Sequence, residues 1–73
     1  MKMEAKQYKG IITDWRIERR GRGAVVIGIV VKHINKDMFP IGSPIQTSLI
    51  NSFFFKKDGK ATVVTLNSKY TLL

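Results

Sequence analysis

The chain has 73 residues, and its 13 lysines and arginines against 5 aspartates and glutamates give a formal net charge of +8. It contains no cysteine and one histidine, which excludes disulfides, thiolate metal sites and histidine clusters. The longest apolar run, Ala24–Val31, is far shorter than the ~20 residues of a transmembrane helix, and the N-terminus lacks the apolar core of a secretory signal. We therefore expect a small cytoplasmic domain, away from membranes, whose positive field attracts acidic partners.

An alternation of apolar and polar residues predicts a half-buried strand over residues 7–18. Ile11, Trp15 and Ile17 share one face of this strand, which we expect to pack on the core. Ile12 lies on the other face, which we expect to meet solvent. The strand would thus contribute alternate residues to the core along its whole length.

A segment of arginines and glycines, residues 19–23, interrupts this pattern and predicts a hairpin loop with exposed guanidinium groups. The next strand, residues 24–33, is apolar on both faces, which indicates a central strand or one at a subunit interface. Gly28 within it indicates a bend, a bulge or the close approach of another backbone.

The second half of the chain begins with a long irregular stretch, residues 34–44, which holds two prolines and several turn-forming residues. Further along, Asp58-Gly59 predicts a type I′ turn, which needs a positive φ at both central residues. The elements expected after the irregular stretch are two strands, this turn, a third strand and a last extended piece: residues 45–50, 51–57, 58–59, 60–66 and 70–73.

Five or six short antiparallel strands in one domain, residues 1–73, predict an all-β fold. The expected architecture is a small barrel of the SH3-like or OB-like type, or a curled sheet. Residues 1–6 are expected to form a loose N-terminal segment ahead of the first strand.

Positive charge supplies the main candidate site, because four arginines lie within seven residues at a strand end and hairpin tip. Arginine suits phosphate because its planar fork donates two hydrogen bonds at once. A solvated turn whose charges keep a sheet edge soluble is the alternative explanation. The residues predicted to contact nucleic acid or an acidic partner are Arg16, Arg19, Arg20, Arg22, Lys32 and Lys36, with Lys56 and Lys57 as a second patch.

Three consecutive phenylalanines, residues 53–55, cannot all face inward because neighbours in a strand alternate sides. At least one should be exposed, cover a second cluster or meet a partner chain. Exposed aromatic rings next to basic residues are typical of proteins that stack the bases of single strands. The candidate aromatic contacts are Phe39, Phe53 and Phe55.

No group of side chains indicates catalysis or metal binding. His33 has no cysteine, histidine or carboxylate close to it in the sequence, so we expect a polar residue at a strand end. Asp14 and Glu18 lie beside Arg16, which indicates local ion pairs rather than an acid–base couple. The glycines of the arginine segment lack the spacing of a phosphate-binding loop. We therefore expect a non-enzymatic protein without a cofactor or a metal.

Two segments of the C-terminal half, Gly42–Ser48 and Val64–Leu72, carry a G-x-x-I-x-T-S pattern and a V-x-T-x-N-S-x-Y-x-L ending, whose first valine is Val63. This combination resembles small uncharacterised proteins encoded by phages and prophages. The resemblance implies a protein that binds host machinery or nucleic acid. The motif also has a structural explanation, because the side chains of Thr47, Ser48, Asn67 and Ser68 can hold turns through bonds to the backbone.

Three hypotheses for the function follow. The first is a binding protein whose basic face contacts nucleic acid without strong base specificity. The second is a phage- or mobile-element-encoded inhibitor that binds an acidic surface of a host protein. The third is a homo-oligomer whose subunits bury the apolar second strand and the phenylalanine triplet against each other.

Overall fold

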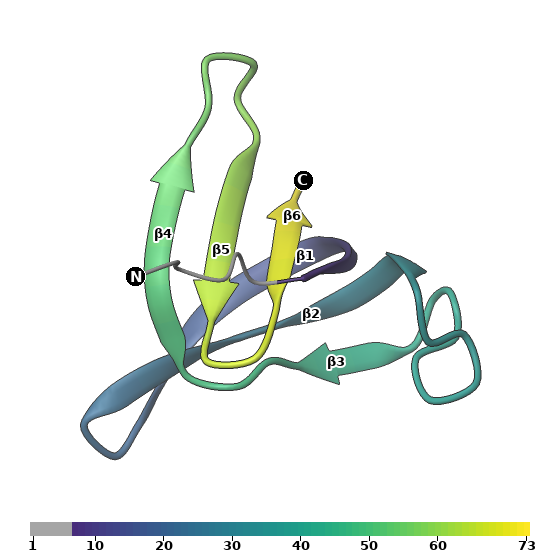
Figure 1. Cartoon of the computed structure of the whole chain (residues 1–73), viewed down its shortest axis with the longest axis horizontal. Coiled ribbons are helices and arrows are strands. Elements are labelled where there is room, and N and C mark those ends of the chain that lie inside the picture. Colours follow the sequence, from purple (N-terminus) through teal and green to yellow (C-terminus); the bar gives the residue numbers. More distant parts are fainter. Residues whose placement is uncertain (1–6) are drawn as a thin grey trace, which may run out of the picture.

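The computed structural model describes residues 7–73, which form one curved sheet and contain no helix (Figure 1). Accordingly, no helix in this part of the chain is long and apolar enough to cross a membrane. The predicted all-β fold is confirmed, whereas the loose segment expected over residues 1–6 lies outside the described residues. The strands are β1 (Tyr8–Arg20), β2 (Gly23–His33), β3 (Pro44–Gln46), β4 (Ile50–Phe55), β5 (Ala61–Thr65) and β6 (Lys69–Leu72).

The sheet consists of two three-stranded meanders that meet in the middle. Its strand order is β3-β2-β1-β6-β5-β4, and every neighbouring pair is antiparallel except β1 and β6, which are parallel. The edge strands β3 and β4 follow each other in the chain with only residues 47–49 between them, so the sheet curls around without closing. Of the two predicted forms, the curled sheet is the one observed.

A bulge in β1 corrects the predicted orientation of its side chains. Asp14 has a positive φ of 51°, and the register shows Asp14 and Trp15 together opposite Gly28. Such a two-against-one bulge reverses the alternation of the strand. Before the bulge it is Ile12, 1% exposed, that lies in the core, and not Ile11 as predicted. After the bulge, Trp15 packs against the core as predicted, but the prediction for Ile17 is wrong, because its side chain is 48% exposed where β1 extends beyond the core.

Gly28 allows β1 to pass directly over β2 at this bulge. A Cβ atom at position 28 would lie 2.5 Å from Cγ2 of Ile12 and 2.8 Å from the carbonyl oxygen of Thr13. Both distances are shorter than van der Waals contact, so only glycine fits. The predicted close approach of another backbone is therefore confirmed.

The hydrophobic core lies inside the curl and draws on both meanders. The buried residues that form it are Ile12, Val26, Val30, Ile45, Ala61, Val63, Tyr70 and Leu72. Trp15 closes one side of the core, and its indole Nε1 donates a 2.9 Å hydrogen bond to the carbonyl oxygen of Leu73. β2 lies between β1 and β3, which confirms the prediction of a central strand.

The first hairpin is tighter than the sequence predicted. Arg20 pairs with Gly23, so only Gly21 and Arg22 form the loop, and Arg19 belongs to β1 rather than to the loop. Gly21 has a φ of 61°, which is the pattern of a type II′ turn with glycine at the first central position. This turn lets the ladder continue to the tip.

The β4–β5 turn is also of a different type from the one predicted. Only Gly59 has a positive φ, 85°, so the type I′ prediction is wrong. The N–H of Gly59 donates to the carbonyl of Lys56, and the carboxylate of Asp58 accepts from the N–H of Lys60. These bonds and the left-handed glycine are typical of a three-residue hairpin loop.

Candidate nucleic-acid interface and a polar pocket

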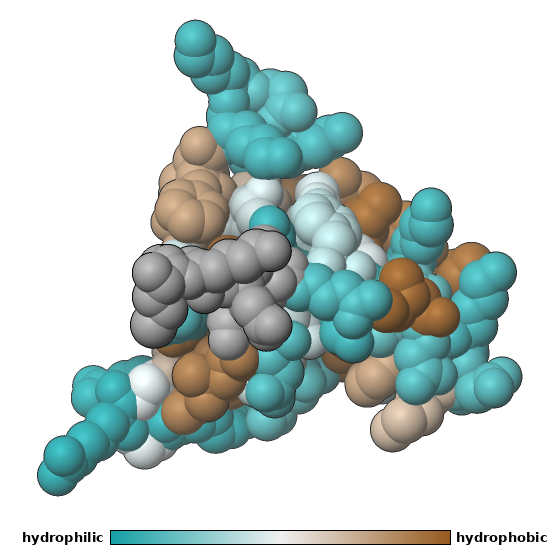
Figure 2. Space-filling model, viewed as in Figure 1, coloured by the Kyte–Doolittle hydropathy of each residue, from teal (hydrophilic) through white to brown (hydrophobic). Residues whose placement is uncertain are grey.

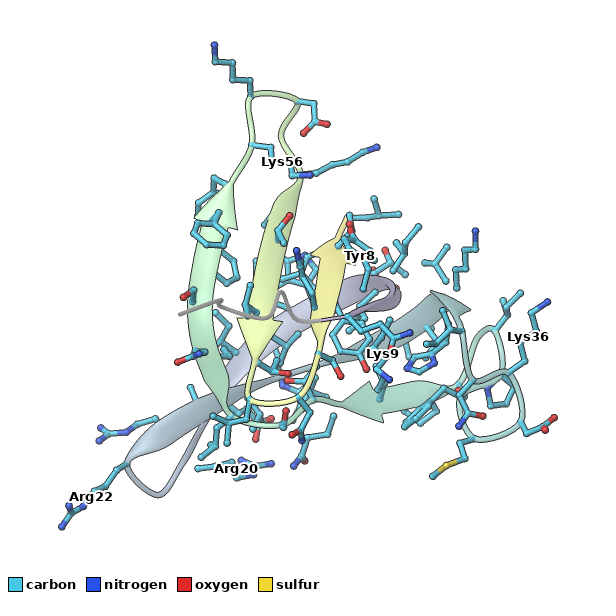
Figure 3. All side chains as sticks on the ribbon, in the orientation of Figure 1. Tyr8, Lys9, Arg20, Arg22, Lys36 and Lys56 are labelled. Atoms are coloured by element: carbon cyan, nitrogen blue, oxygen red, sulfur yellow. The ribbon has the colours of Figure 1, made fainter. Side chains whose placement is uncertain are left out.

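The predicted cationic residues form three separate groups and not one basic face. Figure 3 shows Arg20 and Arg22 at the lower left, Lys56 at the top and Lys36 at the far right. Residues 23–32 of β2 span about 30 Å, which separates Arg20 and Arg22 at the start of the strand from Lys32 near its end, while Arg16 lies opposite Ile27 near the middle. The members of the three groups are Arg16, Arg19, Arg20 and Arg22; Lys32 and Lys36; and Lys56 and Lys57.

The arginines lie on a two-stranded part of the sheet, residues 16–27, which we call the arginine ribbon. β6 pairs with β1 only up to Ile12, and β3 pairs with β2 only from Ile27 onward. Beyond these points β1 and β2 pair with no other strand, although Val26 still bonds to Thr47 and lies in the core. From there to its tip the hairpin projects from the body (Figure 1). Figure 2 shows hydrophilic residues at its tip and at the β4–β5 turn, the two projecting ends of the molecule.

Glu18 binds two of the ribbon's arginines. Its carboxylate accepts a 2.8 Å hydrogen bond from Nε of Arg16 and another 2.8 Å bond from a guanidinium nitrogen of Arg20. These bonds from Arg20 and Arg16 lower the pKa of the Glu18 carboxyl, which therefore stays ionised. The predicted ion pairs are confirmed for Glu18, but Asp14 makes none with residues 7–73.

The remaining two arginines of the ribbon have no carboxylate partner in the described part of the chain. Arg19 lies opposite Ala24, on the other face from Glu18, and Arg22 occupies the turn. Four arginines and one glutamate give residues 16–23 a charge of 4 − 1 = +3. The ribbon therefore combines two oriented guanidinium groups with two unpaired ones.

The phenylalanine triplet is divided between core and surface, as predicted. Phe53 packs against the core with its ring 5.6 Å from that of Trp15, whereas Phe54 and Phe55 are 52% and 75% exposed. These two lie at the end of the edge strand β4, next to Lys56 and Lys57 in the chain. Phe39 has one ring face covered, because its ring centroid lies 4.3 Å from that of His33, and it also lines a pocket.

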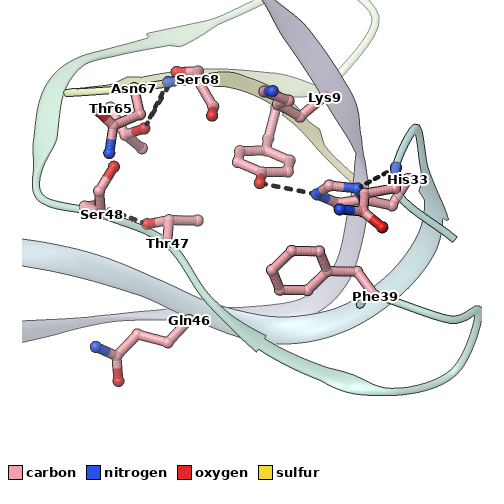
Figure 4. A pocket seen from close by; sticks show the side chains of 11 residues that line it. Lys9, His33, Phe39, Gln46, Thr47, Ser48, Thr65, Asn67 and Ser68 are labelled. Carbon is pink, nitrogen blue, oxygen red and sulfur yellow. Dashed lines mark hydrogen bonds between the residues drawn. The ribbon is translucent and has the colours of Figure 1, made fainter. Parts of the chain in front are cut away.

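A pocket of about 240 Å³ opens between four segments that are far apart in the sequence (Figure 4). Its walls come from Lys9 in β1, the end of β2 at His33, the link after β3 at Ser48, and the β5–β6 turn at Asn67. Among residues 7–73, no aspartate or glutamate lines it. Several polar residues of the two C-terminal motif segments meet in this pocket, which is the only signal of it in the sequence.

His33 ends β2 as predicted, and its side chain is one of several buried polar groups that line the pocket, with 5% exposure. Its Nδ1 accepts a 2.9 Å hydrogen bond from the N–H of Asn35, so the neutral ring carries its proton on Nε2 and donates it to the hydroxyl of Tyr70, 3.1 Å away. Burial lowers the pKa of His33, and the charge of Lys9 lowers it further. The imidazole is therefore neutral at neutral pH.

Part of the C-terminal motif serves the fold, as predicted. The hydroxyl of Thr47 accepts from the N–H of Val26 and donates to the carbonyl of Ser48. Ser68 takes part through its backbone N–H, which donates to the hydroxyl of Thr65. The side chains of Ser48 and Asn67, also expected to hold turns, make no hydrogen bond within residues 7–73.

No family model, curated protein or solved structure matches the chain. The resemblance of the C-terminal half to phage proteins therefore stays a prediction. Within residues 7–73, no three histidine, cysteine, aspartate or glutamate side chains lie close enough together to hold a metal ion. The candidate sites are therefore the arginine ribbon and the polar pocket.

Proposed function

We propose that the protein binds nucleic acid through the arginine ribbon, without strong base specificity and without catalysing a reaction. The observation that carries this proposal is the ribbon itself: a projecting two-stranded hairpin with a charge of +3. A two-stranded β-ribbon is of a size that the ~12 Å major groove of B-DNA admits. We propose, as expected from the sequence, that the protein acts in the cytoplasm.

The ribbon's arginines would bind phosphates in two ways. Arg16 and Arg20 are held in place by Glu18, so less side-chain freedom is lost when they bind. Arg19 and Arg22 are free to reach phosphate groups on either side of the hairpin. If all four contact phosphates, the logarithm of the binding constant should fall with the logarithm of salt concentration with a slope of about −3.6.

The test is a fluorescence anisotropy titration with a duplex oligonucleotide over a series of salt concentrations. Replacing Arg19 and Arg22 by alanine should weaken binding and reduce the steepness of the salt dependence by about 1.8, because two phosphate contacts are lost. The matched control replaces Lys56 and Lys57, which removes the same charge from the other hairpin. Equal losses in the two variants would contradict the proposal.

The second candidate function is inhibition of a host protein through an acidic surface, as phage-encoded proteins do. One observation favours it: Met38 and Ile41 are 71% and 78% exposed in the loop that also carries Lys36. Apolar side chains beside cations are typical of protein interfaces. Replacing Met38 and Ile41 by serine should abolish the pull-down of a host protein after nuclease treatment, whereas loss in the Arg19 and Arg22 variant alone would exclude this loop.

A further inference from the structure

Three polar side chains in the pocket are not used by the fold. Lys9, Ser48 and Asn67 make no side-chain hydrogen bond or ion pair with any other residue in the range 7–73. They come from β1, from the link between β3 and β4, and from the β5–β6 turn. The fold thus brings three free polar groups from distant segments to one cavity (Figure 4).

The pocket favours an anion. The lining contains the ammonium group of Lys9 and no carboxylate. His33 is neutral and its two ring nitrogens are occupied by Asn35 and Tyr70, so it neither adds charge nor competes for the ligand. Because no described carboxylate lies beside it, Lys9 can donate charge-assisted hydrogen bonds to an oxyanion.

The charged and neutral groups lie at opposite sides of the pocket. Figure 4 shows Ser48 and Asn67 together at the left, Lys9 at the upper right, and Phe39 at the lower right, below His33. An amide such as Asn67 offers a donor and an acceptor side by side, which matches the edge of a nucleobase. The rings of Phe39 and Tyr70, both in the lining, provide an apolar wall for a planar group.

The size of the pocket limits the ligand to a small molecule. Its volume of 240 Å³ corresponds to about eight water molecules at roughly 30 Å³ each. This is below the ~300–1,000 Å³ of pockets for drug-sized ligands. A single nucleotide can enter with its ring inside and part of its sugar at the open mouth.

We infer that this pocket binds a nucleoside monophosphate, with the phosphate at Lys9, the ring along Phe39, and the base edge at Ser48 and Asn67. The same group at the phosphorylated end of a strand has the same chemistry. The three residues that we expect to hold the ligand lie outside the arginine ribbon, and the two sites meet at Gln46, which lines the pocket and accepts a 3.5 Å hydrogen bond from Arg20. It adds a small-molecule ligand to a protein whose proposed function is the binding of a polymer.

The test is an NMR titration of the ¹⁵N-labelled full chain with adenosine monophosphate, adenosine and inorganic phosphate. The monophosphate should shift the backbone amides of Lys9, Ser48 and Asn67, and should bind more tightly than adenosine or phosphate alone. Lys9→Gln should weaken its binding about tenfold and leave adenosine binding unchanged, because the lost bond is the charge-assisted one. Asn67→Ala should weaken both about fivefold.

The matched control is Lys56→Gln, which removes one charge far from the pocket and should leave all three affinities unchanged. An oligonucleotide with a 5′ phosphate, compared with one bearing a 5′ hydroxyl, shows whether strand ends also enter the pocket. That comparison uses the Arg19 and Arg22 variant, so that failure of the ribbon and failure of the pocket are distinguishable. Absence of amide shifts around the pocket, or equal affinity for phosphate and monophosphate, would overturn the inference.

Discussion

The arginine ribbon and the polar pocket differ in how the chain builds them. The ribbon is local: its residues lie within twelve consecutive positions, and one tight turn brings the two strands together. The pocket is assembled from β1, the end of β2, the β3–β4 link and the β5–β6 turn. Its residues meet only when the whole sheet has curled.

This difference also separates their chemistry. The ribbon offers charge that water surrounds, with Glu18 orienting Arg16 and Arg20 on one face. Exposed charges of this kind act at long range and are screened by salt. The pocket offers one cation, neutral hydrogen-bonding groups and aromatic walls in a confined space. The first arrangement suits a polyanion, whereas the second suits a single small anion.

The largest expected effect is a loss of stability when glycine is replaced by alanine in the centre of the sheet, compared with the same replacement at the tip of the arginine ribbon. Gly28→Ala places a Cβ atom against the backbone of Thr13 and the side chain of Ile12, in the centre of the sheet. We expect it to lower the free energy of unfolding by about 1–3 kcal/mol or more, since neither strand can move away without opening the core. Urea denaturation followed by circular dichroism measures this loss.

Gly21→Ala is the matched control at the tip of the ribbon. No atom lies within 4 Å of the added Cβ there, so the cost comes only from the φ of 61°. We expect about 1 kcal/mol, because a non-glycine residue adopts this conformation with moderate strain. If the two variants were equally stable, the close approach of β1 and β2 at the bulge would be wrong.

The sequence predicted the features that depend on nearest neighbours. It indicated the strands, the hairpin loops and the exposed arginines, because alternation, glycine and charge act over a few residues. It missed the bulge at Asp14, since an aspartate with a positive φ has no distinct pattern in a strand that otherwise alternates. That one residue decided which of Ile11 and Ile12 entered the core.

For the same reason, the sequence predicted the cations of the candidate sites but not their arrangement in space. Counting cations located Lys32, Lys36, Lys56 and Lys57 correctly on the surface, but their distances from the arginines depend on strand length and topology. From the order of residues alone, one basic face could not be distinguished from three separate groups of cations. The pocket could not be predicted either, because its lining residues have large separations in the sequence.

A smaller expected effect is the pH dependence of stability, which we expect to arise beside the pocket and not in the arginine ribbon. The pKa of His33 is lowered by burial and by Lys9, so the folded protein binds fewer protons than the unfolded chain as the pH falls below about 6.5. Its stability should therefore be complete above that pH and decrease on acidification toward the lowered pKa of the folded state. A protonated Nδ1 also loses the hydrogen bond that it accepts from Asn35.

His33→Gln tests this assignment, because His33 is the chain's only histidine. Urea midpoints of the wild type should fall between about pH 7.5 and about pH 5.5, whereas those of the variant should stay level. The ribbon has no group that titrates in this range, since the pKa of Glu18 is lowered from an already acidic value. If the urea midpoints of both proteins fell equally with pH, the proton uptake would belong to another group. The argument for a neutral imidazole beside the pocket would then fail.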